Sequence, residues 1–321
     1  MVSMEFKLIN LLREKFPHYL GDDCAVISSP KGKLLLTTDE LVQDVHFKLN
    51  YCSLEDVGYK SVSAGCSDIA AMGGELIGVL IAIAIPDGFG ENELSMLYSG
   101  VEKFCRCNCE ILGGNISRTD GKLHIVVSAV GSAPRPILRS GAKADDFIYL
   151  TGTLGGALAG YFLLTNRFSG DISPIQRDML SVRHRKPRSR INEGKLIGEF
   201  EVNSMIDISD GFYSDIMHIA EESNLGINIE IDEIPLYPGV RTVADNLGIE
   251  PHILAARSGE EYELIFTAPE KIGNKVAIAL SEQFDTPVTP VGKMTRTGIN
   301  INLEGKPISP NELIGWEHKF A

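Results

Sequence analysis

Apolar residues recur along this chain in two rhythms, one typical of amphipathic helices and one typical of strands. Helical spacing of apolar positions predicts helices over residues 3–16, 53–62, 93–106, 158–164, 212–220, 238–247 and 270–284. Short apolar runs bounded by Gly, Pro or acidic residues predict strands over residues 33–38, 76–86, 124–131, 147–151, 206–208, 228–231 and 264–266. A chain that mixes these elements belongs to the α/β (α+β) class.

The run at 33–38 ends in polar residues, and these direct the functional interpretation. Leu34 to Leu36 are followed by Thr37, Thr38 and Asp39. If the strand ends there, the three side chains emerge at its carboxyl end, where open α/β sheets present their chemistry.

Three more acidic clusters stand at the boundaries of predicted elements. They are Asp22-Asp23 after Gly21, Ser67-Asp68 in a stretch of small residues, and Asp207-Ile-Ser-Asp210 after an apolar run. Carboxylates drawn together from such distant positions repel one another unless cations hold them. Oxygen ligands of this kind suit Mg²⁺ bridging to phosphates. The pattern therefore predicts a magnesium-dependent phosphoryl-transfer site.

Each cluster taken alone also has a structural interpretation. Acids are common in turns such as 21–23, and close helix packing accounts for the Ala and Gly residues of 64–74. Ser209 or Asp210 is expected to cap the following helix. Neither packing nor capping accounts for Asp68 or Asp207. The same default applies to His46, to Tyr98 on a helical face and to Trp316, which are more often packing residues than ligands.

Two further stretches are predicted to be irregular. Ile111 to Ser117 contains Gly113-Gly114-Asn115, which suggests a phosphate-contacting turn, although no P-loop and no dinucleotide-binding fingerprint is present. The basic run 183–188 is expected to be a solvated loop and helix start.

The length of 321 residues suits two domains. The Pro-containing stretch 132–136 is the best linker candidate, so we place the boundary between residues 1–137 and residues 138–321.

Charge and hydropathy narrow the range of partners. A formal charge of −13 argues against nucleic acid or an anionic membrane surface. No stretch approaches the roughly 20 apolar residues of a membrane span, and residues 1–5 carry no export signal, so a cytoplasmic protein is expected. Of the six cysteines, Cys105, Cys107 and Cys109 are closely spaced, but zinc sites usually add a second distant pair. Buried or reduced thiols are favoured over zinc.

Taken together, the motifs resemble the thiamine-monophosphate kinase family, within the superfamily of aminoimidazole ribonucleotide synthetase. The resemblance follows family order over nearly the whole chain. It is carried by Gly21-Asp-Asp-Cys-Ala-Val, Thr37-Thr-Asp-Glu-Leu-Val with His46-Phe47, Ser67-Asp-Ile-Ala-Ala-Met-Gly, Arg139-Ser-Gly-Ala-Lys, Ile206-Asp-Ile-Ser-Asp-Gly, Ser258-Gly-Glu-Glu-Tyr-Glu-Leu and Gly315-Trp-Glu-His.

The resemblance implies ATP-dependent phosphorylation of thiamine monophosphate to thiamine diphosphate, with Mg²⁺. It also implies a two-domain architecture in which a mixed N-terminal sheet pairs in a homodimer and a C-terminal α/β domain completes the substrate site. The metal ligands would be Asp23, Thr37, Thr38, Asp39, Asp68, Asn115, Asp207 and Asp210, of which Asp39, Asp68 and Asp207 would carry catalysis. ATP would meet Tyr98, Gly114, Asn115, Arg139 and Ser209. The thiamine phosphate would meet His46, Trp316 and one of Glu260 and Glu261.

One departure from the family pattern concerns the metal site. Where the family has Gly-Gly-Asp, this chain has Gly113-Gly114-Asn115. An amide in place of a carboxylate removes one charge from any metal position there. Two alternatives stay open at this point. One is another ATP-using enzyme of the superfamily with a different small substrate, and the other is a catalytically weakened protein that binds nucleotide or thiamine phosphate.

Overall fold

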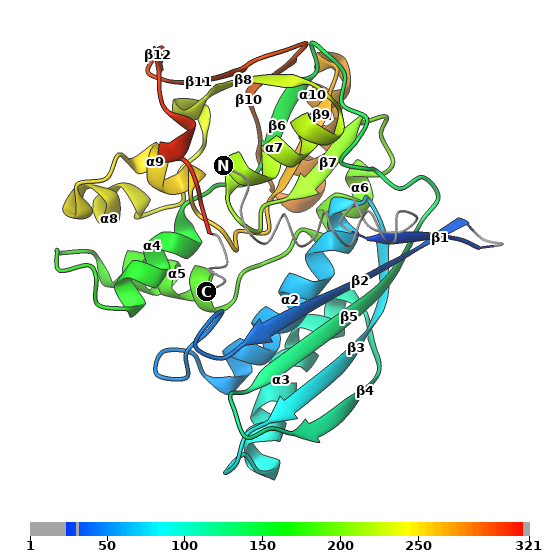
Figure 1. Cartoon of the computed structure of the whole chain (residues 1–321), viewed down its shortest axis with the longest axis vertical. Coiled ribbons are helices and arrows are strands. Elements are labelled where there is room, and N and C mark those ends of the chain that lie inside the picture. The colour runs from blue at the N-terminus through cyan, green and yellow to red at the C-terminus, as the bar shows by residue number, and fades with distance from the viewer. Residues whose placement is uncertain (1–23, 30–31, 317–321) are drawn as a thin grey trace.

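The computed structural model describes residues 24–29 and 32–316, and in it the chain folds around two sheets (Figure 1). The predicted helix at 3–16 and the predicted metal ligand Asp23 lie outside the described residues. No helix in the described part of the chain is both long enough and apolar enough to cross a membrane.

The N-terminal sheet has the strand order β1-β2-β5-β3-β4 and is mixed. Only the pair β3 and β4 is parallel, and the other neighbours are antiparallel. Helices α2 and α3 pack together, and α2 lies against β2 and β5. The elements are β1 (Ala25–Ser29), β2 (Gly32–Val42), α2 (Leu54–Ala71), β3 (Glu75–Ile85), α3 (Glu91–Asn108), β4 (Glu110–Arg118) and β5 (His124–Ala133).

Strand β2 is longer than predicted, and this changes the position of the acidic motif. It continues to Val42, so Asp39 lies within the strand and not at its end. Both neighbours of β2 are antiparallel, so the expectation of a carboxyl edge of a parallel sheet is wrong for this motif. Polar side chains occur mid-strand here because one face of the strand meets α2 and the other is exposed.

Helix α2 begins where the sequence predicts. The Ser53 hydroxyl accepts a bond from Asp56 N–H and the Asp56 carboxylate accepts one from Ser53 N–H, each at 3.1 Å, which completes the capping box. The helix then extends to Ala71 through the run of small residues, which are almost all buried.

Helices α2 and α3 approach each other through glycine. A Cβ added to Gly58 would lie 2.0 Å from Leu97 O, and one added to Gly100 would lie 1.9 Å from Glu55 O. The crossing therefore brings the two backbones into direct contact.

The C-terminal sheet has the order β12-β11-β8-β10-β6-β9-β7. Strands β8 and β11 are parallel, and the other neighbours are antiparallel. The strands are β6 (Phe147–Thr151), β7 (Ser204–Asp207), β8 (Gly226–Glu230), β9 (Leu264–Ala268), β10 (Val288–Thr295), β11 (Ile299–Leu303) and β12 (Lys306–Pro307). The helices are α4 (Gly156–Leu164), α5 (Pro174–Arg185), α6 (Ile191–Ile197), α7 (Phe212–Glu222), α8 (Val240–Leu247), α9 (Pro251–Ala256) and α10 (Glu270–Phe284), with short 3₁₀ turns η1 (Ile231–Glu233) and η2 (Pro310–Glu312).

Both faces of the C-terminal sheet are buried. Along β6, Ile148 and Leu150 join a core with α7 and α9, whereas Tyr149 joins the core that also contains the N-terminal sheet and α2. One apolar cluster is therefore continuous across the two sheets. The domain boundary predicted at 137/138 falls in the connection between β5 and β6, and it stays a prediction.

Two predictions of irregular structure are wrong. Residues 111–117, expected to hold a turn, form the edge strand β4. The basic run is not solvated where it begins, because Arg183 and His184 are buried in the last turn of α5.

Candidate active site

Thr37 and Asp68 meet at the face of the N-terminal sheet that α2 covers. The Thr37 hydroxyl donates to the Asp68 carboxylate at 2.5 Å, and Asp39 points to the same side of β2 as Thr37. The side chain of Asp39 is exposed to solvent, yet its pKa is raised, first by the protein atoms that surround it and then by the charge of Glu260. The structure thus brings two of the predicted metal ligands together and adds a glutamate from the other domain.

The second acidic group lies at the turn between β7 and α7. Asp207 is buried at the end of β7, and Asp210 is partly buried in the turn that follows. The prediction that Ser209 or Asp210 caps α7 is wrong, since the N-cap is Gly211, with φ +128°. Instead, the buried Asp215 carboxylate accepts the N–H groups of Ser209, Asp210 and Gly211 at 3.1 to 3.3 Å.

Asp215 holds this turn at an electrostatic cost. Its pKa is raised well above the usual value by burial and then by the charges of Asp210 and Asp207, while Gly211 N–H and Arg139 lower it. Arg139, which the resemblance assigns to ATP, therefore lies close to Asp215 beside this turn.

The two acidic groups come together at the junction of the domains. Lys60 Nζ of α2 donates to the Glu260 carboxylate at 2.8 Å, and Glu260 N–H donates to Ser209 O at 2.7 Å in the turn that carries Asp207 and Asp210. In agreement with this arrangement, the pKa of the buried Tyr262 is raised well above its usual value first by burial and then by the charges of Glu260, Asp39, Asp207 and Asp210. The acids that were predicted from separate parts of the sequence therefore belong to one site.

The structure separates the two glutamates between which the sequence left a choice. Glu261 is fully buried and its carboxylate binds Arg183 Nε at 3.0 Å and Ala157 N–H at 2.9 Å. Glu260 is partly exposed and has a positive φ of +57°. It directs its carboxylate to Lys60 Nζ at 2.8 Å, beside Asp39. Glu260 is the better placed of the two to contact a substrate.

His46 and Trp316 border the same region. His46 lies in the turn after β2, where its Nδ1 accepts Val42 N–H at 3.0 Å and its carbonyl accepts Lys60 Nζ at 3.0 Å. The backbone N–H of Trp316 donates to Asp210 O at 3.0 Å, and the residue is 51% exposed. Gly315 permits this approach, because a Cβ there would lie 1.9 Å from Asp210 O.

Other predicted ligands are not brought to these acids within one chain. Thr38 points to the opposite face of β2, where its hydroxyl lies 3.1 Å from that of Ser128. Asn115 of β4 pairs with Ala82 of β3, which pairs with Val126 of β5. This register places the Asn115 side chain on the same outer face as Thr38, at the edge of the sheet formed by β4. Gly114 is the exposed neighbour of Asn115 in β4, and Tyr98 is partly buried on α3 against the core.

The donors that do converge fit Mg²⁺ in type, since all are carboxylate or hydroxyl oxygens. The pKa of Asp39 is raised first by desolvation and then by the charge of Glu260, and a cation beside Asp39 would relieve that repulsion. Within residues 24–29 and 32–316, no three His, Cys, Asp or Glu side chains form a preformed metal cage. Mg²⁺ commonly binds through one or two carboxylates and completes its shell with water and substrate phosphates, so this open arrangement suits it.

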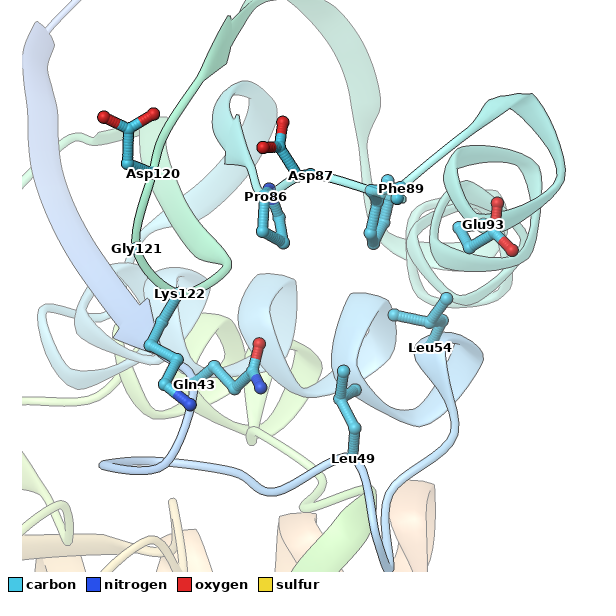
Figure 2. A pocket seen from close by; sticks show the side chains of 11 residues that line it. Gln43, Leu49, Leu54, Pro86, Asp87, Phe89, Glu93, Asp120, Gly121 and Lys122 are labelled. Carbon is cyan, nitrogen blue, oxygen red and sulfur yellow. The ribbon is translucent and has the colours of Figure 1, made fainter.

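A cavity of about 570 Å³ in the described structure is lined by none of the predicted site residues. Figure 2 shows Pro86 and Phe89 pointing toward Leu49 and Leu54 across it. Its charged rim is paired elsewhere, for example Lys122 with Asp44 at 2.6 Å. The cavity therefore offers no group for phosphate chemistry, and we assign the active site to the acidic cluster.

Sequence reasoning missed Lys60 and Asp215, which organise the site without belonging to a recognised motif. A signal for Lys60 existed, because Lys60 and Asp68 are the only charged residues of α2 after its first turn. Asp215 gave no comparable sign, because an acid in the first turn of a helix has an ordinary structural role.

Comparison with known proteins identifies the family of the chain. The model of the AIR synthase related protein, N-terminal domain, matches residues 21–133, and that of the C-terminal domain matches residues 143–302. The thiamine-monophosphate kinase of Aquifex aeolicus is 33% identical over 316 residues, covering 98% of this chain and 97% of the relative. The chain belongs to the thiamine-monophosphate kinase family. The resemblance drawn from the sequence motifs is thereby confirmed.

Solved structures agree with membership of the thiamine-monophosphate kinase family. A structure described as AaThiL complexed with AMPPCP and TMP superposes with a TM-score of 0.86 at 33% identity, covering 99% of both chains. The structure of the thiamine monophosphate kinase from Aquifex aeolicus superposes with a TM-score of 0.82 at 32% identity, covering 96% of this chain and 99% of that one. The two-domain fold expected from the resemblance is confirmed.

Proposed function

We propose that this protein transfers the γ-phosphoryl group of ATP to thiamine monophosphate, forming thiamine diphosphate and ADP with Mg²⁺. The observation that supports the proposal is the junction at which Lys60 Nζ of α2 donates to the Glu260 carboxylate and Glu260 N–H donates to Ser209 O, which brings the acids of the N-terminal domain next to the turn that carries Asp207 and Asp210. The relatives that share the fold over nearly the whole chain are named for this reaction. A different reaction within the superfamily is not favoured.

The transfer needs no covalent enzyme intermediate. An oxygen of the acceptor phosphate attacks the γ-phosphorus in line, and the bond to the bridging oxygen of ADP breaks. The acceptor phosphate is already ionised at neutral pH, so no strong general base is needed. The chain's task is to place the two phosphates and balance their charge.

The acids divide that task between the domains. Asp39 and Asp68 would hold Mg²⁺ from the N-terminal sheet and α2, and Asp207 and Asp210 would hold it from the turn after β7. Mg²⁺ supplies the positive charge that offsets the triphosphate and the acceptor phosphate. Arg139, beside Asp215, would add a fixed positive charge on the ATP side.

The acceptor would lie between Glu260, the His46 turn and Trp316. These groups come from both domains and border the acids, which suits a substrate whose phosphate must reach the metal. The exposed indole of Trp316 offers a planar face on which an aromatic ring could stack.

The proposal includes a homodimer and a cytoplasmic location. The outer face of the N-terminal sheet carries exposed apolar side chains, among them Leu80 and Leu112, and contiguous patches of this kind commonly mark protein interfaces. Pairing of two such faces would cover them and would bring Asn115 and Thr38 next to a second chain. ATP as co-substrate and six free thiols suit the cytoplasm.

The test is formation of thiamine diphosphate from thiamine monophosphate, ATP and Mg²⁺, measured beside Asp39→Ala and Asp68→Ala. We expect product with the wild type and a loss of kcat of at least about 100-fold in each variant, as for removal of a group that stabilises the transition state. Binding of both substrates without product would overturn the proposal in favour of a binding protein. Undiminished activity in both variants would remove the metal assignment.

A further inference from the structure

Lys60 connects the two residues that face the acceptor from opposite domains. Its Nζ donates to His46 O at 3.0 Å and to the Glu260 carboxylate at 2.8 Å. We propose that Lys60 is a positioning residue for the acceptor substrate, acting through His46 and Glu260. The inference rests on the proposed function, which assigns these two residues to thiamine monophosphate.

The burial of Lys60 is the first argument. Its side chain is completely inaccessible to solvent, which is rare for lysine unless the ammonium is paired. A buried ion pair seldom adds net stability over an apolar pair of similar volume, because both charges must be desolvated. Stability alone therefore gives a weak reason for a lysine at this place in α2, whereas precise placement of two partners gives a direct one.

The second argument is the rigidity of the partner segment. Glu260 and Tyr262 both have positive φ, +57° and +51°, a conformation that non-glycine residues rarely adopt. The backbone is held there by Glu260 N–H to Ser209 O at 2.7 Å and by Tyr262 N–H to Ile208 O at 2.9 Å. The segment is thus attached by its backbone to the turn after β7, and Lys60 attaches its carboxylate to α2.

The third argument is that Lys60 supplies the counter-charge to Glu260. His184 Nδ1 lies 3.8 Å from the same carboxylate, but the pKa of His184 is lowered well below its usual value by burial and by the charge of Lys60. The imidazole is therefore neutral near pH 7. In the described part of the chain, Lys60 is the cation that fixes the carboxylate of Glu260, and its loss would leave that carboxylate without a counter-charge beside Asp39, whose charge repels it.

The experiment is steady-state kinetics of Lys60→Met, which keeps the length and apolar character of the stem and removes the ammonium. We expect KM for thiamine monophosphate to rise roughly 10-fold to 100-fold, the range expected for loss of a hydrogen bond between charged groups. KM for ATP should stay within about twofold, because Lys60 contacts no residue assigned to ATP. A residue with a merely structural role would not separate the two substrates.

A double-mutant cycle tests whether Lys60 acts through Glu260. Glu260→Gln should raise the acceptor KM at least as much as Lys60→Met, because Glu260 also faces the acceptor, and the double variant Lys60→Met/Glu260→Gln should show an acceptor KM close to that of Glu260→Gln, because Lys60 then has no carboxylate to hold. If Lys60→Met fails to fold, the double variant carries the test, since it leaves no uncompensated carboxylate. Additive effects of the two substitutions would overturn the proposal.

Lys103→Met is the matched control, because Lys103 also pairs with an acid of α2, Glu55, at 2.7 Å but is exposed. It should leave both KM values unchanged. A wild type that forms no thiamine diphosphate would refute the proposed function itself. An active wild type with a folded Lys60→Met variant whose acceptor KM is unchanged, or whose two KM values rise equally, would overturn the role of Lys60 alone.

Discussion

At the scale of single residues, burial decides which groups near the site carry charge. His184 is enclosed between the rings of Tyr51 and Tyr161, with centroid distances of 5.8 and 5.6 Å. Its Nε2 is buried without a hydrogen-bond partner in the described structure. Glu260 lies close enough to favour the imidazolium, but Lys60 already offsets that carboxylate, so desolvation prevails and the pKa is lowered.

This state of His184 predicts a pH dependence of stability. The unfolded chain takes up a proton at a pKa of about 6.5, while the folded chain does not until a much lower pH. Protons therefore favour the unfolded state, and this contribution to stability falls as pH decreases below about 6.5, by up to about 1.4 kcal/mol per pH unit. Urea unfolding at pH 7 and pH 5.5 should show a smaller decrease for His184→Gln than for wild type.

The control for this prediction is His252→Gln, which replaces a histidine paired with Glu250 at 3.1 Å away from the site. It should keep the pH dependence of the wild type. Equal slopes for wild type and His184→Gln would mean that His184 titrates normally in the folded protein.

At the scale of elements, the crossing of α2 and α3 places the functional side chains of α2. Gly58 and Gly100 bring the helix backbones into contact, and α2 presents Lys60 and Asp68 on faces that meet the other domain and β2. The glycines are the cause of this placement, since any side chain at the crossing would push the helices apart.

The crossing predicts that Gly100→Ala destabilises the protein although alanine favours helix. The gain in helix propensity is about 1 kcal/mol, but the new Cβ would lie 1.9 Å from Glu55 O, a backbone atom that cannot rotate away. Overpacking of this kind costs about 1 to 3 kcal/mol or more, so we expect a net loss of unfolding free energy in urea. Gly121→Ala, where the nearest atom is Thr119 Oγ1 at 3.5 Å, should have little effect. A Gly100→Ala variant as stable as wild type would show that the helices can separate freely.

At the scale of the whole molecule, the two domains are joined firmly and one sheet face is left uncovered. Besides the shared apolar core, Arg185 and Lys186 at the end of α5 pair with Asp56 and Glu55 of α2 at 2.8 to 3.1 Å, which ties the C-terminal domain to the N-terminal domain. The acids of the site thus have a fixed frame. The outer face of β3 and β4 presents Leu80, 44% exposed, and Leu112, 47% exposed.

The uncovered face predicts that Leu80→Lys weakens the proposed homodimer. Burial of a lysine charge in an apolar interface is unfavourable, so light scattering after size exclusion should show a shift from dimer to monomer at micromolar concentration. Ile175→Lys, at an isoleucine 73% exposed on α5, is the matched control and should leave the assembly unchanged. A wild type that is monomeric at all concentrations would contradict the prediction.

Much of the fold followed from local patterns, and the misses have physical causes. The strand at 147–151 and the helix at 270–284 are found as predicted, because each buries an apolar pattern of the right period. The predicted strand ends at residue 38, whereas β2 continues to Val42. The polar residues Thr37, Thr38 and Asp39 do not end the strand, because one of its faces packs against a helix and the other is open to solvent. Gly113-Gly114-Asn115 predicts a turn because glycine has a low strand propensity. In the structure, hydrogen bonding to β3 outweighs this low propensity and holds the segment in a strand.

The sequence by itself determined to which family the chain belongs and predicted which acids take part, because motifs and their order along the chain are local properties. Tertiary structure alone decided which of these segments meet. It joined α2 to the segment of Glu260 through Lys60, enclosed Glu261 in an ion pair with Arg183, and turned Thr38 and Asn115 to the other face of the N-terminal sheet. The physical reason is that the direction of a side chain depends on strand register and on contacts between segments about 200 residues apart, as for Lys60 and Glu260.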